Sequence, residues 1–329
     1  MKTSDFDYHL PKSLIAQKAL KKRDNSKLLI AKTLEHKKFY NILDYLNKGD
    51  VLVVNEAKVS KVKLTGKKLT GSPAEIIIER KVKGYYECRV NTRNPAVGTI
   101  ILLKKGLKAK IIGRDGPIIH IKFNRSLNLN KLGELPQPNY IKRIITEQEY
   151  QTVYAKKQGS IASPTAGLHF TKQLLKKIKD KGVKVAKINL NIGFGTFLPI
   201  TEDKIENHKM HSETFEINKS AANTINNCKR LICVGTTSLR ALESAKYKKG
   251  KILPTKTSTD IFIKPGYKFK SKTKILITNF HLPKSTLLLM VSAFASKKLI
   301  LKAYKEAIKK KYRFYSLGDS MLLENSHPQ

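Results

Sequence analysis

Cysteine, arginine and acidic residues are scarce in this sequence of 329 residues, and long apolar runs are missing. The three cysteines, Cys88, Cys228 and Cys233, form no CxxC pair, which is typical of a protein from a reducing compartment. The longest nearly apolar run, residues 286–295, is far too short to span a membrane. The N-terminus, MKTSDFDYHL, contains no apolar signal core. We therefore expect a cytoplasmic protein without a membrane partner.

Basic residues outnumber acidic ones by 65 to 25, which gives a formal net charge of +40. Such a charge favours a polyanionic partner, above all RNA. Only 10 of the basic residues are arginine, although guanidinium groups are the usual choice for phosphate recognition. Lysine, isoleucine and asparagine are frequent throughout, as in proteins from AT-rich genomes. The charge is therefore compatible with an RNA substrate without establishing one.

The order of the expected elements predicts an α/β fold with an inserted small β-barrel. Residues 1–57 and 146–329 alternate helices with strands, which is typical of an α/β catalytic domain with a largely parallel sheet. Residues 58–145 contain short β-rich runs separated by turns, with Asp115-Gly116 as a hairpin signal. Strands at this spacing predict a small barrel, inserted into the α/β domain.

Capping residues predict where two helices begin. Thr146 and Glu149 form a capping box for a helix that would run through Tyr154. Thr171 is expected to cap a helix that ends at Gly182.

The segment TNFHLPKSTLLLM, residues 278–290, carries the most informative local signal. A buried strand over residues 274–277 is expected to run into a polar turn with Asn279 and His281, and then into an apolar helix with Ser285 as its N-cap. In α/β proteins, ligands bind at the carboxyl ends of strands beside helix N-termini. The segment is therefore either a ligand site or a capping loop with a structural histidine.

The turn Gly235-Thr236-Thr237 also follows an expected strand and opens a helix. Its free N–H groups, two hydroxyls and helix dipole suit a carboxylate or a phosphate. Arg240 lies one turn further on the same face, where it could serve the ligand or pair with Glu243 at the surface. The turn lacks the glycine spacing and the lysine of a P-loop, so ATP hydrolysis is not supported.

A third turn after an expected strand contains Gly193 and Gly195, which would allow a ligand to approach the backbone closely. Phe194 and Phe197 could cover a flat base. The third glycine of a dinucleotide fingerprint is missing, so NAD binding is not expected. A purely structural turn is the alternative.

Several histidines are candidates for acid–base chemistry. His169, in the small polar segment 163–170, is either an acid–base group or a structural residue at a helix start. His208 and His211, with Glu213, resemble metal ligands. No Cys or third His follows at the usual spacing, so we expect no metal.

The segment KKKYRFY, residues 309–315, alternates cations with aromatic residues. This pattern suits phosphates and stacked bases. The alternative is an exposed helix end with aromatic anchors in the core. Asp319, in the turn that follows, is either a ligand-facing carboxylate or a turn cap.

These segments resemble the S-adenosylmethionine:tRNA ribosyltransferase-isomerase family of queuosine biosynthesis. TNFHLPKSTLL and four further blocks match that family in the same order, and DFDYHLPKSLIAQ and the turn at Asn55 also fit. The four blocks are YQTVYA with GSIASPTAGLHF (150–170), HKMHSE (208–213), VGTTSLRALES (234–244) and AYKEAIKKKYRFYSLGDSM (303–321). The resemblance extends over essentially the whole chain.

The resemblance implies a transferase that moves and isomerises the ribosyl part of S-adenosylmethionine onto 7-aminomethyl-7-deazaguanine at the wobble position of tRNA. The product would be epoxyqueuosine, with release of adenine and methionine. S-adenosylmethionine is then a consumed co-substrate, and no cofactor is expected. We expect a monomer whose partner is tRNA bearing the precursor base. The alternatives are a non-catalytic basic tRNA-binding protein and a metal-dependent nucleic-acid hydrolase using His208 and His211.

The implied chemistry assigns roles to the candidate residues. The sulfonium acidifies the C5′ proton, which a general base with a pKa near 7 can remove. The candidates for acid and base are His211, His169 and His281, and Glu213 could face the sulfonium or the amine. The expected substrate-binding residues are Thr165, Gly193, Gly195, Thr236, Thr237, Arg240, Asn279, Arg313 and Asp319, with Thr236, Thr237 and Arg240 chosen for the methionine carboxylate.

The sequence departs from the family pattern at several positions. Asn191, Gln158 and Leu317 stand where the family usually has His, Pro and Tyr, and Ala57-Lys58 replaces Thr-Arg. The missing histidine argues against position 191 as the essential base. The change from Arg to Lys leaves a point charge without bidentate geometry.

Overall fold

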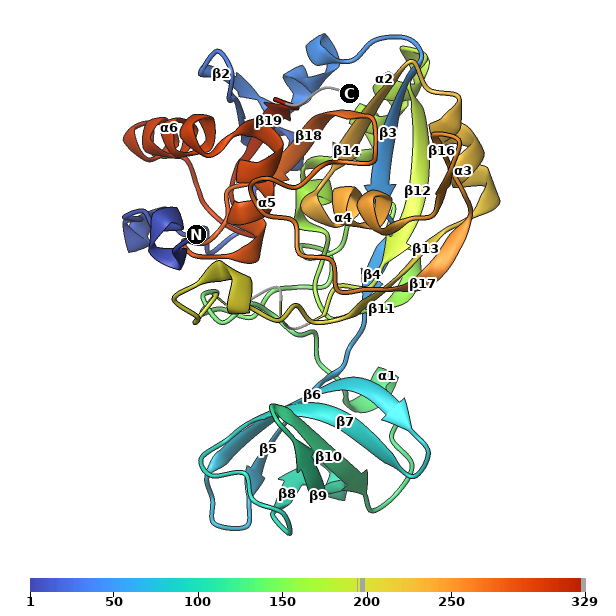
Figure 1. The fold of residues 1–329 in the computed structure, drawn as a ribbon. Coiled ribbons are helices and arrows are strands. Elements are labelled where there is room, and N and C mark those ends of the chain that lie inside the picture. Colours follow the sequence, from blue (N-terminus) through green and yellow to red (C-terminus); the bar gives the residue numbers. More distant parts are fainter. Residues whose placement is uncertain (194, 196–198, 327–329) are drawn as a thin grey trace. The chain divides into compact units, whose positions relative to one another are not determined.

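The computed structural model describes residues 1–193, 195 and 199–326. Contacts divide the chain into two compact units, residues 1–58 with 138–329 and residues 59–137. The first unit is an α/β structure and the second is a closed β-barrel (Figure 1). The predicted fold class is therefore confirmed.

A mixed nine-stranded sheet forms the centre of the α/β unit, with strand order β17-β13-β12-β3-β14-β18-β19-β1-β2. The four central strands β12, β3, β14 and β18 are parallel, and β19 is also parallel to β1. The other pairs are antiparallel. The strands are β1 (Lys27–Ile30), β2 (Glu35–Lys38), β3 (Asp50–Asn55), β12 (Lys184–Leu190), β13 (Glu213–Ile217), β14 (Arg230–Val234), β17 (Thr255–Thr259), β18 (Thr273–Asn279) and β19 (Ser320–Glu324).

The central strands are buried on both faces, as expected for parallel strands covered by helices. All six residues of β3 are buried. Because side chains alternate along a strand, Val51 and Val53 join one core cluster while Leu52 and Val54 join the cluster on the opposite face. The α-helices of this unit are α2 (Lys172–Asp180), α3 (Lys219–Asn226), α4 (Thr236–Ser244), α5 (Thr286–Ala295) and α6 (Lys297–Lys309).

Helix α2 packs against one face of the sheet, and α3 to α6 pack against the other (Figure 1). Short 3₁₀ turns and two-stranded ladders complete the unit. The turns are η1 (Thr3–Phe6), η2 (Lys12–Leu14), η3 (Arg23–Asn25), η4 (Phe39–Tyr45), η6 (Thr165–His169) and η8 (Ile205–Asn207). The ladders pair β4 (Ala57–Val59) with β11 (Lys157–Ser160), and β15 (Tyr247–Lys248) with β16 (Lys251–Ile252).

The second unit is a closed six-stranded antiparallel barrel with strand order β10-β7-β6-β5-β8-β9. Inward-facing aliphatic side chains such as Ile76, Ile101 and Ile121 form its core. The predicted hairpin at Asp115-Gly116 is confirmed, since it joins β9 to β10. The barrel elements are β5 (Lys63–Lys68), β6 (Pro73–Val82), β7 (Tyr85–Asn91), β8 (Ile100–Leu103), η5 (Lys104–Gly106), β9 (Lys108–Asp115), β10 (Ile118–Phe123) and α1 (Leu129–Leu132).

Residues 138–145, expected with the barrel, belong to the α/β unit by contacts. Gln17 connects these residues to the N-terminal part of the α/β unit. Its side-chain amide nitrogen donates to the carbonyl of Tyr140 at 2.9 Å, and its amide oxygen accepts from the backbone N–H of Lys142 at 3.0 Å.

The helix predicted over residues 146–154 is wrong, although its capping box forms. The backbone N–H of Glu149 donates to the Thr146 hydroxyl at 3.2 Å. Arg23 donates to the carbonyl oxygens of Gln148 and Gln151, and in a helix the carbonyl of Gln148 would accept from the N–H of Thr152. The segment therefore forms turns. The predicted cap at Thr171 is confirmed, because its hydroxyl accepts from the backbone N–H of Leu174 at 3.0 Å at the start of α2.

In the part of the chain that the structure describes, no helix is long and apolar enough to cross a membrane.

Candidate functional site

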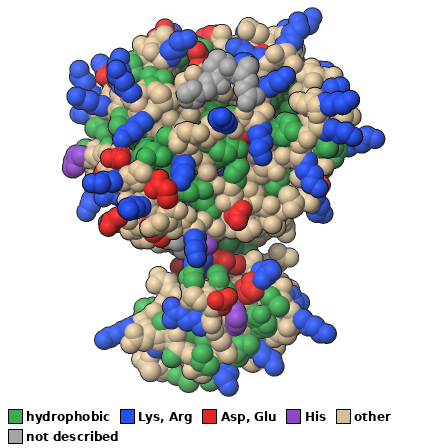
Figure 2. Space-filling model, viewed as in Figure 1, with side chains coloured by type: hydrophobic (Ala, Val, Ile, Leu, Met, Phe, Trp, Pro, Cys, Tyr) green, Lys and Arg blue, Asp and Glu red, His purple; other side chains and the backbone are tan. Residues whose placement is uncertain are grey.

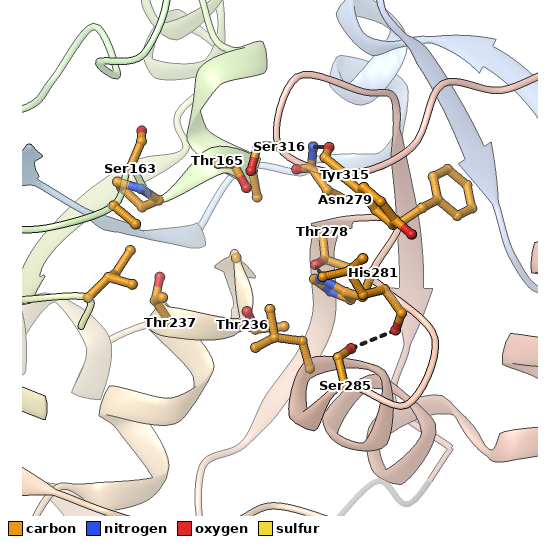
Figure 3. Close-up of a pocket in the computed structure, with 18 of the residues that line it drawn as sticks. Ser163, Thr165, Thr236, Thr237, Thr278, Asn279, His281, Ser285, Tyr315 and Ser316 are labelled. Carbon is orange, nitrogen blue, oxygen red and sulfur yellow. Dashed lines mark hydrogen bonds between the residues drawn. The ribbon is translucent and has the colours of Figure 1, made fainter. Parts of the chain in front are cut away.

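A cavity opens at the carboxyl ends of the neighbouring parallel strands β14 and β18 (Figure 3). It encloses about 680 Å³, part of it open to solvent. We call it the central cavity. Its walls are Tyr140, Ala162, Ser163, Pro164, Thr165, Ala166, Ile192, Gly235, Thr236, Thr237, Thr278, Asn279, Phe280, His281, Leu282, Ser285, Leu287, Tyr315 and Ser316.

Gly235 makes the turn from β14 into α4. Its φ of 86° and ψ of 149° lie in a region that residues with a side chain rarely adopt. The turn directs Thr236 and Thr237, the first residues of α4, toward the cavity (Figure 3). The hydroxyl of Thr237 is buried and has no hydrogen-bond partner among the described residues. The start of α4 therefore presents an unused polar atom beside the positive end of a helix dipole.

Ser285 caps α5, as its position in the sequence predicts. Its hydroxyl accepts from the backbone N–H of Leu288 at 3.2 Å and donates to the carbonyl of Leu282 at 2.7 Å (Figure 3). Two helix N-termini, those of α4 and α5, thus border the same cavity. Together they favour a negatively charged group in the cavity.

His281 lies in the wall of the central cavity and is held in place by the loop between β18 and α5. Its Nε2 is 2.9 Å from the hydroxyl of Thr278. Its backbone N–H donates to the hydroxyl of Tyr304 at 2.8 Å, and its carbonyl accepts from the hydroxyl of Tyr8. Burial lowers the pKa of His281 to about 3. The imidazole is therefore neutral at pH 7, although the expected general base had a pKa near 7.

His169 does not reach the central cavity. It lies in a neighbouring depression of about 300 Å³, which we call the middle hollow. Its Nδ1 is 2.8 Å from the hydroxyl of Ser26, and its ring stacks on Phe39 with centroids 4.9 Å apart. Burial lowers the pKa of His169 to about 4, an effect that Asp319 partly offsets. The middle hollow is lined by Ala19, Leu20, Arg23, Ser26, Glu149, Leu168, His169, Arg313, Ser316, Leu317 and Gly318.

His211 and Glu213 lie in a third depression, which we call the side pocket. It adjoins the central cavity because Leu287 lines both. His211 is exposed, whereas the Glu213 side chain is almost fully buried. The side pocket is lined by Gly195, His208, Met210, His211, Glu213, Arg240, Ile261, Phe262, Ile263, Thr286, Leu287 and Met290.

Arg240 forms a buried ion pair with Glu213, so the predicted surface pair with Glu243 is wrong. Its guanidinium also donates to the carbonyls of Ile261 at 3.3 Å and Thr259 at 3.4 Å. It therefore lies in the side pocket and does not share the central cavity with the two threonines of α4. It does not pair with Glu243 either.

Glu243 is buried on the other side of α4. Its carboxylate accepts hydrogen bonds from the backbone N–H groups of Lys270 and Ser271, at 2.7 and 3.0 Å. Burial raises its pKa, against the effect of these hydrogen bonds. Glu243 thus fixes the loop before β18.

The two predicted glycines of the third turn contact the side pocket. The backbone N–H of Gly193 donates to Glu213 at 2.8 Å, and a side chain at Gly195 would collide with the ring of His211. Phe194 and Phe197, predicted to cover a base, lie outside the described residues. His208 faces Glu202 with Nδ1 and Oε2 3.1 Å apart.

Arg313 and Asp319 form a structural unit beside the middle hollow. The buried carboxylate of Asp319 accepts from the backbone N–H groups of Arg313 at 2.8 Å and Lys27 at 3.0 Å. It therefore ties the turn before β19 to β1, and it does not line the central cavity. Tyr312 and Phe314, expected as stacking partners for bases, are buried anchors, so the stacking prediction is wrong for them.

Several residues of the central cavity were not among the predicted site residues. Ser163 is buried, and its hydroxyl has no partner among the described residues. Tyr140 and Tyr315 pack together with ring centroids 4.9 Å apart. Ser163 and Tyr315 stand inside blocks that carry the family resemblance, which could have identified them, whereas no sequence signal marks Tyr140. Thr165 and Asn279 were predicted and do line the cavity.

Among residues 1–193, 195 and 199–326, no group of three or more His, Cys, Asp or Glu side chains is placed so that it could hold a metal ion.

A family model described as queuosine biosynthesis protein matches residues 3–323. The chain belongs to this queuosine biosynthesis family. Two relatives named S-adenosylmethionine:tRNA ribosyltransferase-isomerase, from Desulforamulus reducens and a Sulfurihydrogenibium species, are 43% and 47% identical over 98% of this chain and 100% of their own length. The S-adenosylmethionine tRNA ribosyltransferase structure from Thermotoga maritima has 34% identity and a TM-score of 0.54, covering 97% of this chain and 99% of that one. The resemblance found in the sequence blocks is confirmed.

Two departures from the queuosine family pattern are accommodated locally. Lys58 pairs with Glu147 at 3.4 Å. The side-chain amide of Asn191 donates to the hydroxyl of Thr214 at 3.1 Å. Neither departure lines the central cavity.

The two buried histidines predict an acid-labile fold. The pKa values of His169 and His281 are about 4 and 3 in the folded chain, below about 6.5 in the unfolded chain. The unfolded chain therefore takes up protons first as the pH falls. We expect stability to be complete above about pH 6.5 and to fall by up to about 1.4 kcal/mol per pH unit for each histidine. Urea unfolding at pH 7 and pH 5 measures this change.

The variant His169→Asn should show a weaker pH dependence than the unmodified protein. His9→Asn, which changes an exposed histidine, is the matched control and should leave the dependence unchanged. Equal dependence in all three proteins would show that the buried imidazoles are not the source.

The Glu213–Arg240 pair is expected to hold the fold of the side pocket. Glu213→Gln or Arg240→Met alone should lower the free energy of unfolding by about 3–5 kcal/mol, because each leaves a buried charge unpaired. The double variant should lose at least about 1 kcal/mol less than the sum. The exposed pair of Arg80 and Glu87, separated by 2.6 Å, is the control, and its disruption should cost less than about 1 kcal/mol. A stable but inactive Glu213→Gln would contradict this structural role.

Proposed function

We propose that this chain transfers and isomerises the ribosyl moiety of S-adenosylmethionine onto 7-aminomethyl-7-deazaguanine at the wobble position of tRNA, giving epoxyqueuosine, adenine and methionine. One observation carries the proposal. A chain matched over nearly its full length by ribosyltransferase-isomerases has a cavity with two helix N-termini, unused hydroxyls and no acidic side chain in its walls. This is a suitable environment for a small ligand with a carboxylate and a sulfonium.

The methionine carboxylate fits the start of α4. The backbone N–H groups of Thr236 and Thr237, the unpartnered Thr237 hydroxyl and the helix dipole all favour a negative charge there. Arg240 is left out of this binding site because Glu213 already holds it. Of the three residues predicted to bind the methionine carboxylate, the proposal therefore keeps Thr236 and Thr237.

The sulfonium would meet aromatic and neutral polar groups instead of carboxylates. Tyr140, Phe280 and Tyr315 line the cavity, and aromatic faces attract cations. A carboxylate in contact with the sulfonium would neutralise the positive charge that acidifies the C5′ proton. A cavity without acids preserves this acidity.

His281 is the histidine that lines the central cavity, and we assign proton transfer to it. Its neutral imidazole is in the form that accepts a proton, and Thr278 fixes its orientation. A pKa of about 3 makes it a weak base in the empty cavity. Removal of the C5′ proton of S-adenosylmethionine would place that proton on the imidazole of His281. The resulting imidazolium can protonate the departing adenine.

The same proposal makes S-adenosylmethionine a consumed co-substrate and requires no resident cofactor. The partner is tRNA bearing the precursor base, acted on by a monomer in the cytoplasm. Lysine and arginine side chains are scattered over the visible surface in Figure 2, and they would supply the general attraction for this polyanion.

Isotope labelling tests the reaction directly. The protein is incubated with precursor-bearing tRNA and with S-adenosylmethionine labelled either in the ribose or in the methyl group, and the tRNA is digested and analysed by mass spectrometry. We expect ribose label in epoxyqueuosine and none from the methyl group. Unmodified tRNA is the control. Methyl label without ribose label in the tRNA would refute the proposal.

Replacing His281 should affect the rate much more than binding. His281→Asn is expected to lower kcat about a hundredfold to ten-thousandfold, as for loss of a general acid–base group. tRNA affinity should change less than about twofold, because lysines dominate backbone contacts. His211→Asn, an exposed change in the side pocket, is the matched variant and should retain more activity. The reverse order of the two variants would move the acid–base role to His211.

A further inference from the structure

A basic depression on the α/β unit contains four cations without an ion-pair partner among the described residues. We call it the outer hollow, and its cations are Lys21, Lys22, Arg23 and Lys172. The other lining residues are uncharged. None of the four cations forms an ion pair with a residue in the described ranges. Since ion pairs cancel much of the positive potential of a cation, the unpaired cations of the outer hollow should give it a positive potential.

The nearest carboxylates are engaged elsewhere. Glu149 forms an ion pair with Arg143, and its pKa falls to about 2 because of the hydrogen bonds from that guanidinium. The carboxylate of Asp24 is buried and accepts a hydrogen bond from Thr171 at 3.1 Å. Neither carboxylate lines the outer hollow.

Two further features of the outer hollow favour binding of an anion. The N-terminus of α2, where Thr171 is the cap and Lys172 the first helical residue, borders the hollow. Thr152 also lines it, is only 5% exposed, and its hydroxyl has no hydrogen-bond partner in the part of the chain that is described. A buried hydroxyl without a partner is costly unless a ligand or water satisfies it.

The outer hollow, the middle hollow and the central cavity are linked by shared lining residues. Arg23 lines both the outer and the middle hollow. Ser316 lines both the middle hollow and the central cavity. Arg313 adds a further guanidinium along the middle hollow. Arginine side chains thus line the outer and middle hollows, next to Glu149 and beside the central cavity.

We propose that the outer hollow binds the phosphodiester backbone of the tRNA beside the nucleotide whose base enters the central cavity. The inference rests on the proposed function, which requires one base to leave its stack and enter an enclosed site. Four cations in one hollow can contact more than one phosphate of a strand. Lysines act there as point charges that hold the backbone in place without reading its sequence.

Another basic hollow, lined by Lys27, Lys37, Lys38 and Lys310, is less suited to this role. Lys37 faces Glu35 at 3.8 Å. The ammonium of Lys27 donates to the carbonyl of Lys310 at 2.9 Å and lies over a tyrosine ring. This hollow shares no lining residue with the central cavity or the middle hollow. It serves as the control surface.

The test compares two triple variants with equal loss of charge. One carries Lys21→Ala, Lys22→Ala and Lys172→Ala. The other carries changes of Lys37, Lys38 and Lys310 to Ala. Affinity for fluorescently labelled, precursor-bearing tRNA is measured by anisotropy between about 50 and 300 mM salt. Calorimetric titration with S-adenosylmethionine alone verifies that the central cavity is intact in each protein.

We expect the outer-hollow variant to lose about two to three units from the slope of log affinity against log salt, one for each phosphate contact. A change of two to three units in this slope corresponds to a loss of affinity of about a hundredfold to a thousandfold at about 0.1 M salt, relative to 1 M salt. The control variant should lose less than one unit. S-adenosylmethionine affinity should be unchanged in both.

An unchanged slope in the outer-hollow variant, or an equal loss in the control variant, would overturn the docking proposal. Absence of tRNA binding by the unmodified protein would overturn it as well. If the unmodified protein binds both substrates with a steep slope but forms no epoxyqueuosine, the proposed function fails while the docking surface is still judged by binding. If product forms normally in the outer-hollow variant at matched low tRNA concentrations, only the docking surface is wrong.

Discussion

The parallel pairing of β14 with β18 is the constraint on which the rest of the site depends. Because these strands run side by side and end at the same edge of the sheet, the helices that follow them, α4 and α5, both begin there. Their N-termini give the central cavity a positive potential without any charged side chain in its walls. The backbone N–H of Gly235 donates to the carbonyl of Ile277 at 2.8 Å and so joins the two strand ends directly.

Local signals predicted this edge of the sheet well, because they act over a few residues. The cap at Ser285, the turn at Gly235 and the polar residues after β18 were all readable from short segments. The alternation of helices and strands, followed by closely spaced short strands, predicted the α/β unit and the barrel for the same reason. Periodicity and turn chemistry depend on neighbouring residues only, so they predict local structure without knowledge of distant contacts.

Roles that depend on distant partners were not predictable in this way. Arg240 was assigned by its spacing from Thr237, but its partner Glu213 lies 27 residues away in the chain. The capping box of residues 146–154 formed without its helix, because Arg23, far away in sequence, takes the carbonyl groups of that segment. In each case a hydrogen bond between a guanidinium and an oxygen distant in sequence replaced the arrangement that the local pattern predicted.

The few arginines of this chain are largely engaged within the fold. At least six of the 10 arginines pair with carboxylates inside one unit, and Arg230 holds the buried Asp50 with two hydrogen bonds of 3.1 and 2.6 Å. Planar guanidinium groups are thus used where fixed geometry stabilises the fold. Charge for the RNA is left to lysines, whose mobile ammonium groups attract a backbone without demanding one geometry. Few arginines therefore do not argue against a nucleic-acid substrate when selection of the target nucleotide rests with an enclosed cavity and not with the surface that holds the strand.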